Sequence, residues 1–180
     1  MCEQFYNSTH NEITCQLRKD SGLKSGIAYS VEVLVKNFGF ALHDGSFSVN
    51  YLPKVTDIYP LSGSVKGGTK VNIIGDGFNG QTTFAKIGPK IYYPGVNLLV
   101  TNSKIILTTY PTDEGSYVVQ VFVDNKAVEH SGSNTFNFSL NSTPVVESVF
   151  PTEINKTSSV TLIGTNFGNF LISILEIYRI

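Results

Sequence analysis

The stretch Val55-Thr-Asp-Ile-Tyr-Pro60, followed by Val71-Asn-Ile-Ile-Gly75, decides the fold, because it returns later in the chain. Its second copy reads Val146-Glu-Ser-Val-Phe-Pro151 and Val160-Thr-Leu-Ile-Gly164. The offsets are 146 − 55 = 91 and 164 − 75 = 89 residues. A repeat of nearly fixed period indicates that one structural unit occurs several times along the chain.

A second set of matches links the start of the chain to its middle. Tyr29-Ser-Val-Glu-Val33 matches Tyr117-Val-Val-Gln-Val121, and Phe47 matches Phe136. These offsets are 117 − 29 = 88 and 136 − 47 = 89 residues, so one period covers both halves of the chain. The two ends of the given sequence therefore fall inside repeats and not at repeat boundaries.

The period divides the chain into three predicted units. Residues 1–52 correspond to the C-terminal half of one repeat, residues 53–140 to a complete repeat, and residues 144–180 to the N-terminal part of a third. A unit of about 90 residues, made of short strands separated by turns, has the size of an immunoglobulin-like β-sandwich. The abundance of Val, Ile, Phe, Tyr and Thr agrees with strands. We predict an all-β chain of tandem immunoglobulin-like (E-set) β-sandwiches, one complete and two partial.

Alternation along the predicted strands indicates which side chains face the core. In residues 117–123 the odd-numbered positions are Tyr or Val, and in the matching residues 29–35 the even-numbered positions include Glu32. The odd-numbered face is therefore predicted to point inward. In the last strand of the complete repeat the same rule places three side chains inward: Phe136, Phe138 and Leu140.

Four glycines mark the predicted turns of the complete repeat: Gly67, Gly68, Gly75 and Gly77. Glycine tolerates positive φ, so the strand at residues 71–75 is expected to end in a tight bend, after which Phe78 caps the core. Residues 75–80 also fit G-x-G-x-x-G, a dinucleotide-binding pattern. Such a loop opens a helix, whereas the residues after Gly80 have strand character. We therefore predict a structural turn.

Charge and motifs exclude several classes of function. The chain has 13 Lys and Arg against 14 Asp and Glu, a formal net charge of -1, so no long-range field attracts nucleic acid. The common catalytic and metal-binding motifs are missing from the sequence, and we predict a non-enzymatic protein without a cofactor. The apolar stretch at residues 170–175 is too short for a membrane span, which needs about 20 residues, and no secretory leader is visible at the start.

Titratable residues are predicted to lie in solvated turns. His43-Asp44 and Glu129-His130 occupy matching hairpin regions, where loop residues explain them better than halves of a catalytic pair. Asp113-Glu114 and Asp124-Asn125 offer oxygen atoms, but they lack the alternating acidic ladder of a calcium loop. A turn is expected at each of these sites.

Four Asn-x-Ser/Thr sequons favour a secreted protein: Asn7, Asn137, Asn141 and Asn155. Asn137 falls on the predicted outward face of its strand, where a glycan is sterically allowed. The other three are placed in turns or linkers. All four are candidate N-glycosylation sites.

The motifs of the complete repeat resemble those of IPT/TIG domains, the immunoglobulin-like modules of plexins, of the hepatocyte growth factor receptor and of slime-mould cell-surface proteins. The resemblance rests on P-x-V-x-x-I-Y-P at residues 53–60, on the Gly67-Gly68 turn, on V-x-I-I-G-x-G-F at residues 71–78 and on G-x-Y-x-V-x-V at residues 115–121. It covers the whole middle repeat, and the flanking parts match its halves.

The resemblance also implies a pairing for the 2 cysteines of the chain. Extracellular TIG domains have a cysteine pair at about the position of Cys15, which follows Ile13 in a predicted strand. A disulfide between Cys2 and Cys15 is therefore the leading interpretation. Closing so short a loop stabilises a fold by about 3 kcal/mol. The alternative is a pair of reduced thiols in a cytosolic protein.

The function that the resemblance implies is non-catalytic recognition or adhesion at the cell surface, within a larger extracellular or membrane-anchored protein. The expected partner is a protein, including another TIG-repeat surface protein, and not nucleic acid. Two alternatives remain: an accessory module of a secreted polysaccharide-acting enzyme, and a Rel-like DNA-binding domain. The DNA-binding alternative predicts clustered Lys and Arg, whereas the basic residues here are scattered.

The two partial repeats are complementary halves of one unit. Each is expected to leave part of an apolar sheet unpaired. Either the chain is a piece of a longer protein, or separate chains complete one another head to tail.

Overall fold

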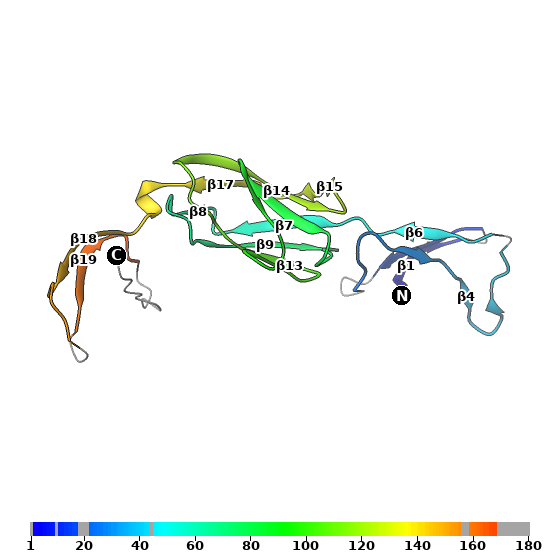
Figure 1. Cartoon of the computed structure of the whole chain (residues 1–180). Helices are drawn as coiled ribbons and strands as arrows, with labels where there is room; N and C mark the ends of the chain where they lie inside the picture. The colour runs from blue at the N-terminus through cyan, green and yellow to red at the C-terminus, as the bar shows by residue number, and fades with distance from the viewer. Residues whose placement is uncertain (1, 10, 18–21, 44, 156–158, 169–180) are drawn as a thin grey trace.

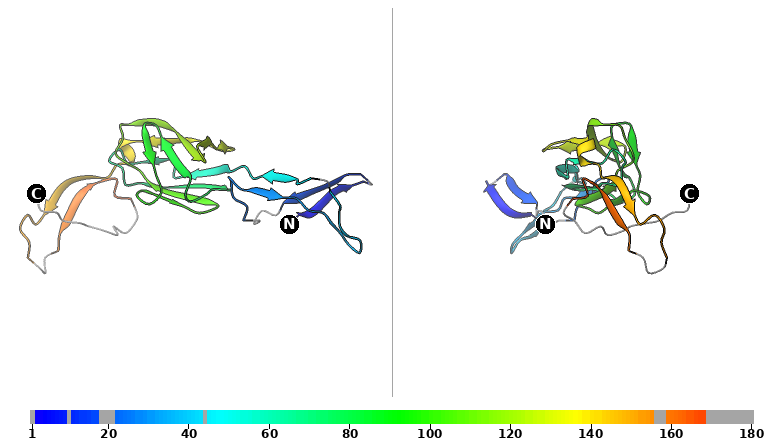
Figure 2. Two further views of the ribbon diagram at one scale, coloured as in Figure 1. Left: turned by 45° about the vertical axis from the view of Figure 1, so that its right-hand side comes forward. Right: turned by 90° about the vertical axis from the view of Figure 1, so that its left-hand side faces the viewer.

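The computed structural model describes residues 2–9, 11–17, 22–43, 45–155 and 159–168, and for residues 2–8 and 17 the backbone alone. The apolar stretch at residues 170–175 lies outside this part. Three β-rich parts follow one another along the length of the molecule, and among the described residues only the middle part has two sheets packed face to face (Figures 1 and 2). Within the described residues, no helix is long and apolar enough to cross a membrane.

The N-terminal part consists of three separate antiparallel pairs, β1 with β2, β3 with β6 and β4 with β5. Their bounds are β1 Cys2–Ser8, β2 Ile13–Leu17, β3 Ala28–Ser30, β4 Leu34–Val35, β5 Gly39–Phe40 and β6 Ser48–Asn50. The C-terminal part is one antiparallel pair, β18 Val145–Phe150 with β19 Thr161–Thr165. A short 3-10 helix, Leu140–Ser142, connects it to the middle part.

The middle part is a β-sandwich, which confirms the predicted fold class. One sheet has the order β12-β13-β9-β7-β16, and the other has the order β11-β10-β14-β17-β8, with β15 paired to β14. The bounds are β7 Lys54–Tyr59, β8 Ser62–Gly63, β9 Lys70–Asp76, β10 Thr83–Ile87, β11 Lys90–Tyr92, β12 Leu98–Val100, β13 Lys104–Thr108, β14 Gly115–Val123, β15 Lys126–Ala127, β16 Glu129–His130 and β17 Thr135–Phe138.

A single core of buried apolar side chains lies between these two sheets. The odd-numbered positions of β14 contribute Val119, Val121 and Val123, as the alternation predicts. Phe136 of β17 is buried with them, and Phe78 covers one end of the core. Each such side chain contributes about 1.5–3 kcal/mol by leaving water, so this core holds the middle part together.

Leu140 does not continue the inward face of β17, contrary to the prediction, and it is 58% exposed. The strand ends at Phe138 because Ser139 is the N-cap of the 3-10 helix that begins at Leu140. There the Ser139 hydroxyl accepts a hydrogen bond from the Asn141 backbone N–H. Alternation between faces applies only while the chain stays extended.

The C-terminal hairpin repeats the strand pairing of the middle sandwich. Val55 lies opposite Gly75 in β7–β9, and the matching residues Val146 and Gly164 lie opposite each other in β18–β19. Each pair has a register shift just after this rung. The repeat seen in the sequence therefore extends to the backbone ladder.

The N-terminal part reproduces the ladder of β14 with β17, with one correction to the expected match. Tyr29 pairs with Val49, where Tyr117 pairs with Phe136. Val49, and not Phe47, therefore corresponds to Phe136. The turn between β4 and β5 has three residues, one more than the turn between β14 and β15. The extra residue shortens the offset between the repeats from 88 residues at Tyr29 to 87 at Val49, whereas the expected match of Phe47 used an offset of 89.

The predicted strand at residues 29–35 is interrupted, and its odd-numbered side chains are not buried. β3 ends at Ser30 and β4 begins at Leu34, although the Val31 backbone N–H still donates to the Phe47 carbonyl. Within the described part of the chain no second sheet covers this surface. Three valines that were expected inward are therefore exposed: Val31, Val33 and Val35.

Candidate functional site: an exposed aromatic row

The residues that were singled out in the sequence for possible chemistry lie apart from one another in the middle sandwich. Among the described residues, no group of three or more His, Cys, Asp or Glu side chains could hold a metal ion. The loop at residues 75–80 leads into strand β10 and not into a helix. Asp124 and Asn125 form the two-residue turn between β14 and β15, both with positive φ. This turn type explains the pair without calcium.

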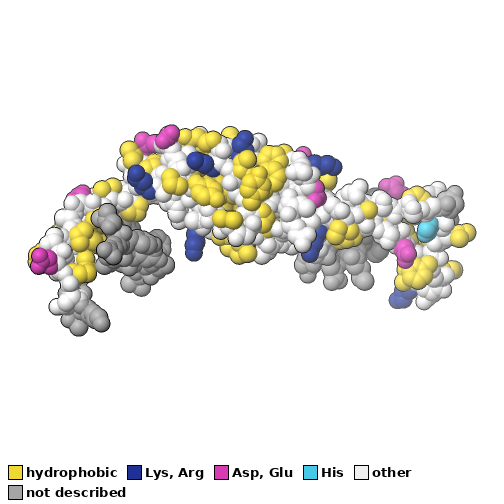
Figure 3. Space-filling view, in the orientation of Figure 1, with side chains coloured by type: hydrophobic (Ala, Val, Ile, Leu, Met, Phe, Trp, Pro, Cys, Tyr) yellow, Lys and Arg dark blue, Asp and Glu magenta, His cyan; other side chains and the backbone are white. Residues whose placement is uncertain are grey.

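Three aromatic side chains form a row on the outer face of the β11-β10-β14 sheet, and we call Phe84, Tyr93 and Phe122 the aromatic row. Phe84 and Phe122 lie opposite each other on β10 and β14. Their rings stack with 4.7 Å between centroids and 5° between planes. The Tyr93 ring lies 5.8 Å from Phe84 at 35°. Figure 3 shows hydrophobic side chains gathered on the face of the middle part that is turned to the viewer.

The outer face of a sheet in water normally carries polar side chains, so the aromatic row needs another explanation. Stacking stabilises each ring pair by about 0.5–1.5 kcal/mol, but Tyr93 remains 57% exposed. Ile91 on β11 and Val118 on β14 are further exposed apolar residues of this sheet. Exposed aromatic clusters of this kind are typical of protein interfaces.

A shallow cavity of about 430 Å³ adjoins the aromatic row and gives it a polar border. Phe84 and Tyr93 form its apolar wall, and polar groups come from Gln81, Asp124 and Asn125. The aromatic row thus has an apolar centre with hydrogen-bonding groups at its rim, which is the usual anatomy of an interface.

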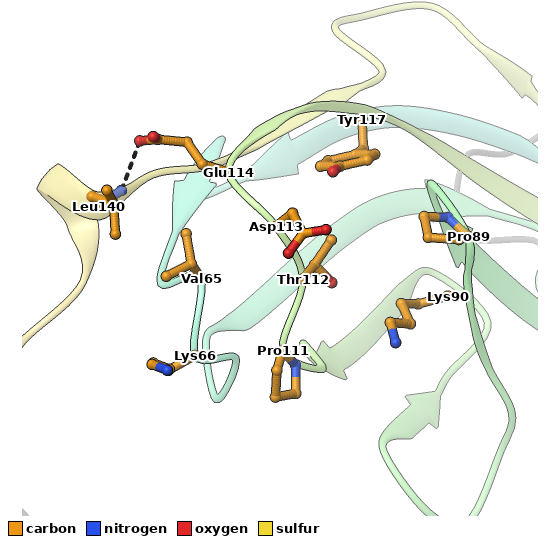
Figure 4. A pocket seen from close by; sticks show the side chains of 10 residues that line it. All are labelled: Val65, Lys66, Pro89, Lys90, Pro111, Thr112, Asp113, Glu114, Tyr117 and Leu140. Atoms are coloured by element: carbon orange, nitrogen blue, oxygen red, sulfur yellow. Dashed lines mark hydrogen bonds between the residues drawn. The ribbon is translucent and has the colours of Figure 1, made fainter.

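A second cavity, of about 540 Å³, lies at the end of the sandwich nearest the C-terminal part (Figure 4). Lys66 and Lys90 lie on either side of Pro111, and Asp113 shares the same rim. Glu114 is already engaged, because its carboxylate accepts a 3.0 Å hydrogen bond from the Leu140 backbone N–H. Charges of both signs border this cavity, so it does not select one charged ligand.

At each junction between neighbouring parts, a residue at the same position of the repeat makes a hydrogen bond across the junction. At the first, Gly77 has a φ of 77° and its carbonyl accepts a hydrogen bond from the Ser25 N–H. At the second, the matching Asn166 has a φ of 60° and its side-chain amide donates to the carbonyl groups of Leu140 and Thr143. Both junctions therefore have contacts beyond the connecting chain.

Tyr51 adds a polar contact at the first junction. Its hydroxyl donates a 2.5 Å hydrogen bond to the Asp76 carboxylate. Burial and this hydrogen bond raise the pKa of Tyr51 to about 12, because both favour the neutral phenol.

The predicted turn glycines occupy two kinds of position. Gly67, Gly68 and Gly77 have positive φ. Gly75 instead lies within β9, where a side chain would collide with the Lys54 carbonyl oxygen across the ladder. Glycine is needed at position 75 because a side chain does not fit there, and not because of an unusual backbone angle.

His130 is not a solvated loop residue, contrary to the prediction. It lies on β16, paired with β7, and among the described atoms neither ring nitrogen has a hydrogen-bond partner. Burial lowers the pKa of His130, because the charged imidazolium loses its hydration. His43, in contrast, is exposed and contacts the Phe47 ring edge-on at 5.9 Å.

The cysteines lie on one hairpin. Cys15 is on β2 and is not a free thiol. Cys2 is on β1, where its backbone lies opposite Leu17, two residues beyond Cys15. The Gln4–Gln16 pair lies between the Cys2–Leu17 pair and the Phe5–Cys15 pair, so the two cysteine backbones are two paired positions apart on the same hairpin.

The sequons lie in different surroundings. Asn137 is exposed on β17, and its side-chain oxygen accepts a 3.4 Å hydrogen bond from the Ser116 hydroxyl. Asn141 is exposed in the 3-10 helix, and Asn155 is exposed between β18 and β19. Asn7 lies within β1 and not in the expected turn.

The sequence could have revealed the aromatic row through one signal. Phe84 and Phe122 fall at positions that alternate with the buried Ala85 and Val121. Large apolar residues at both outward positions of paired strands indicate a functional surface.

The middle part matches a known protein family, and most of the chain aligns with two curated relatives. The family model described as the IPT/TIG domain matches residues 53–139. Two curated relatives align with 91% of the chain: Fibrocystin-L of Mus musculus, 27% identical over 173 residues, and Fibrocystin-L of Homo sapiens, 26% identical over 171 residues. The chain spans 4% of the length of each of these proteins.

Proposed function

We propose, from the premise that residues 53–139 form an IPT/TIG domain, that the chain is a non-catalytic recognition and adhesion segment of a larger extracellular or membrane-anchored protein. The observation that carries the proposal is the aromatic row, in which Tyr93 is exposed beside the partly buried Phe84 and Phe122 on a sheet that already has a complete core. The partner is a protein, such as another TIG-repeat surface protein, because aromatic rings with a polar rim are typical of protein interfaces.

The domain limits are part of the proposal. Residues 53–140 are the complete domain, residues 1–52 the second half of a preceding repeat, and residues 144–180 the first part of a following one. The matching registers of β7–β9 and β18–β19 support this division, as does the ladder shared by β3–β6 and β14–β17.

An extracellular location is supported by two features. Exposed sequons occur at Asn137, Asn141 and Asn155, and Cys15 is not a free thiol. A disulfide between Cys2 and Cys15 fits a chain that folds in an oxidising compartment. Mass spectrometry of the protein from its own cells tests this: a glycan at Asn137 is expected, and an unmodified Asn137 together with reduced cysteines contradicts the location.

Binding through the aromatic row is tested with the chain coupled to fluorescent beads and added to intact cells of the same organism. Tyr93→Ser should lower cell binding by about tenfold or more, because an exposed aromatic anchor at an interface contributes at least about 1.4 kcal/mol. The matched control is Leu99→Ser, an equally exposed apolar residue of the opposite sheet, which should leave binding unchanged.

Three outcomes contradict the proposal. Equal losses in the two variants show that binding does not use the aromatic row. Binding abolished by removal of cell-surface polysaccharide, with protein left intact, favours the accessory module of a polysaccharide-acting enzyme. Tight, salt-dependent retention on duplex DNA favours the Rel-like alternative.

A further inference from the structure

The loop between β9 and β10 contains the only Asn-Gly pair of the sequence, Asn79-Gly80. Asn79 is half-buried, and Gly80 and the following Gln81 are exposed. The backbone nitrogen of the next residue is the nucleophile closest to an asparagine side-chain amide, and a side chain on that residue hinders its approach. Glycine has no such side chain. Among the asparagines of the chain, Asn79 therefore has the lowest steric barrier to attack by its own backbone.

A hydrogen bond in this loop orders the two reacting groups. The Asn79 side-chain oxygen accepts a 3.2 Å hydrogen bond from the Gln81 backbone N–H. The ring that this bond closes contains the side-chain amide carbon of Asn79 and the backbone nitrogen of Gly80. Attack on that carbon places negative charge on the same oxygen, and a donor aimed at a developing negative charge lowers the barrier.

The Gly80 nitrogen is free to act as the nucleophile. Within the described part of the chain, the Gly80 N–H donates no hydrogen bond. The space around this residue is open, because a Cβ on Gly80 would meet only the Val100 carbonyl oxygen, at 3.7 Å. Gly80 is also not among the glycines with positive φ. Alanine is therefore compatible with the backbone at this position, which makes Gly80→Ala a usable test.

We propose that Asn79 is a site of spontaneous deamidation beside the aromatic row. The Gly80 nitrogen loses its proton to a base in the solvent and attacks the side-chain carbon of Asn79. A new N–C bond closes a five-membered succinimide, and the side-chain nitrogen takes up a proton and leaves as ammonia. Water then opens the ring at either carbonyl group, which gives aspartate or isoaspartate. No oxidant or reductant takes part.

Isoaspartate at position 79 loosens the start of β10. The Asn79 carbonyl accepts hydrogen bonds from the N–H groups of Thr82 and Thr83, and the Asn79 N–H donates to the Thr83 hydroxyl. In isoaspartate the main chain runs through the former side chain, so it gains one methylene group and this carbonyl becomes a carboxylate outside the main chain. The next residue, Phe84, belongs to the aromatic row, and Gln81 lies at its polar border. The modification therefore changes the surface beside the aromatic row.

Peptide mapping by mass spectrometry of the full chain, kept at pH 8 and 37 °C, tests the chemistry. The peptide with Asn79 should gain about 1 Da as the amide becomes a carboxylate, and an isoaspartate-specific methyltransferase should label it. Gly80→Ala should slow this reaction by at least about tenfold, because its methyl group hinders the nitrogen. Asn125 is the internal control, since it is exposed but followed by Lys126. It should react at least about tenfold more slowly than Asn79.

Hydrogen exchange tests the structural consequence. Anion exchange separates the aged forms from the fresh chain, because each product carries an added negative charge. The Thr83 amide should exchange at least about tenfold faster in the isoaspartate form, since its acceptor has left the main chain. The Val119 amide, which donates to Asn134 on the other side of β14, should be unchanged and shows that the sandwich is intact.

Three outcomes overturn the proposal. Equal rates at Asn79 and Asn125, or equal rates at Asn79 in the unchanged chain and in Gly80→Ala, exclude the deamidation site. An isoaspartate form whose Thr83 amide is protected as in the fresh chain excludes the loosening of β10. Both readouts use the purified chain and not cell binding, so the proposal goes beyond the proposed function and can fail while that function stands.

Discussion

Two adjacent glycines separate the effect of backbone conformation from the effect of available space. Gly67 and Gly68 have φ values of 77° and 78°. A side chain at Gly67 would lie 2.7 Å from the Pro111 nitrogen and from the Thr109 carbonyl oxygen, whereas a side chain at Gly68 would have no atom within 4 Å. The two positions therefore share the conformational requirement and differ in packing.

Alanine at these two glycines should have unequal effects on stability. Gly68→Ala should lower the free energy of unfolding by about 1–2 kcal/mol, the cost of a left-handed backbone for a residue with a side chain. Gly67→Ala should add about 1–3 kcal/mol to that loss, because the neighbouring backbone has to move. Urea unfolding of both variants measures the difference. Equal losses would show that the contact around Gly67 is looser than described.

His130 should make the stability of the middle sandwich depend on pH. Its pKa is lowered by burial, so the unfolded chain binds the proton more readily than the folded chain does. The stability is therefore complete above the unfolded pKa of about 6.5 and falls as the pH drops through the lower folded pKa. Urea unfolding at pH 7 and pH 5 should show a smaller pH effect for His130→Gln than for the unchanged protein.

The matched control for this pH effect is His43→Gln, because His43 is exposed in the N-terminal part. It should keep the pH effect of the unchanged protein. If both substitutions reduce the effect equally, burial of His130 is not its cause.

At the scale of elements, the strands of the middle sandwich were largely predictable from alternation. Val119, Val121 and Phe136 are buried as expected. In a two-layered fold each sheet has one face in water and one face packed against the core. The repeat of Val55 at Val146 likewise predicted two equivalent hairpins. The alternation of apolar and polar residues predicted the buried face correctly wherever the strand was uninterrupted.

The features that the sequence did not reveal depend on where strands end and on what lies opposite them. Phe47 was expected to match Phe136 at an offset of 89 residues, but Val49 occupies that ladder position, because one extra turn residue shortens the offset from 88 to 87. Leu140 follows the alternation, but the chain leaves the strand before it. His130 was expected in a solvated loop because Glu129-His130 and His43-Asp44 occupy matching hairpin regions, whereas it pairs with β7. These outcomes are set by tertiary structure.

The contact between Tyr51 and β9 should be visible in a pH titration. The pKa of Tyr51 is raised to about 12, so the neutral phenol stabilises the junction fully up to about pH 10, and this contribution is lost as the pH rises through about 12. The difference in absorbance at 295 nm between the unchanged protein and Tyr51→Phe should titrate near pH 12. Asp76→Asn should lower this midpoint, because it removes the negative charge that favours the neutral phenol. A difference curve centred near pH 10 in the unchanged protein contradicts the contact.

At the scale of the whole molecule, the three parts form an extended row (Figure 2). The aromatic row and Asn137 share one sheet, but they lie near opposite ends of β14. Phe122 and Ser116, the partner of Asn137, are six residues apart, or about 20 Å along an extended strand. A glycan at Asn137 therefore leaves the aromatic row accessible to a partner.

One complete repeat lies between two partial ones, and among the described residues only the complete repeat has a closed core. Two matched amides test it, because Val119 N–H donates to Asn134 in the middle sandwich and Val31 N–H donates to Phe47 in the same ladder position. Their hydrogen exchange should be compared at a concentration where the chain is monomeric. The Val119 amide should exchange at least about a hundredfold more slowly than the Val31 amide, because it opens only when the core unfolds. Equal protection of the two amides would contradict it.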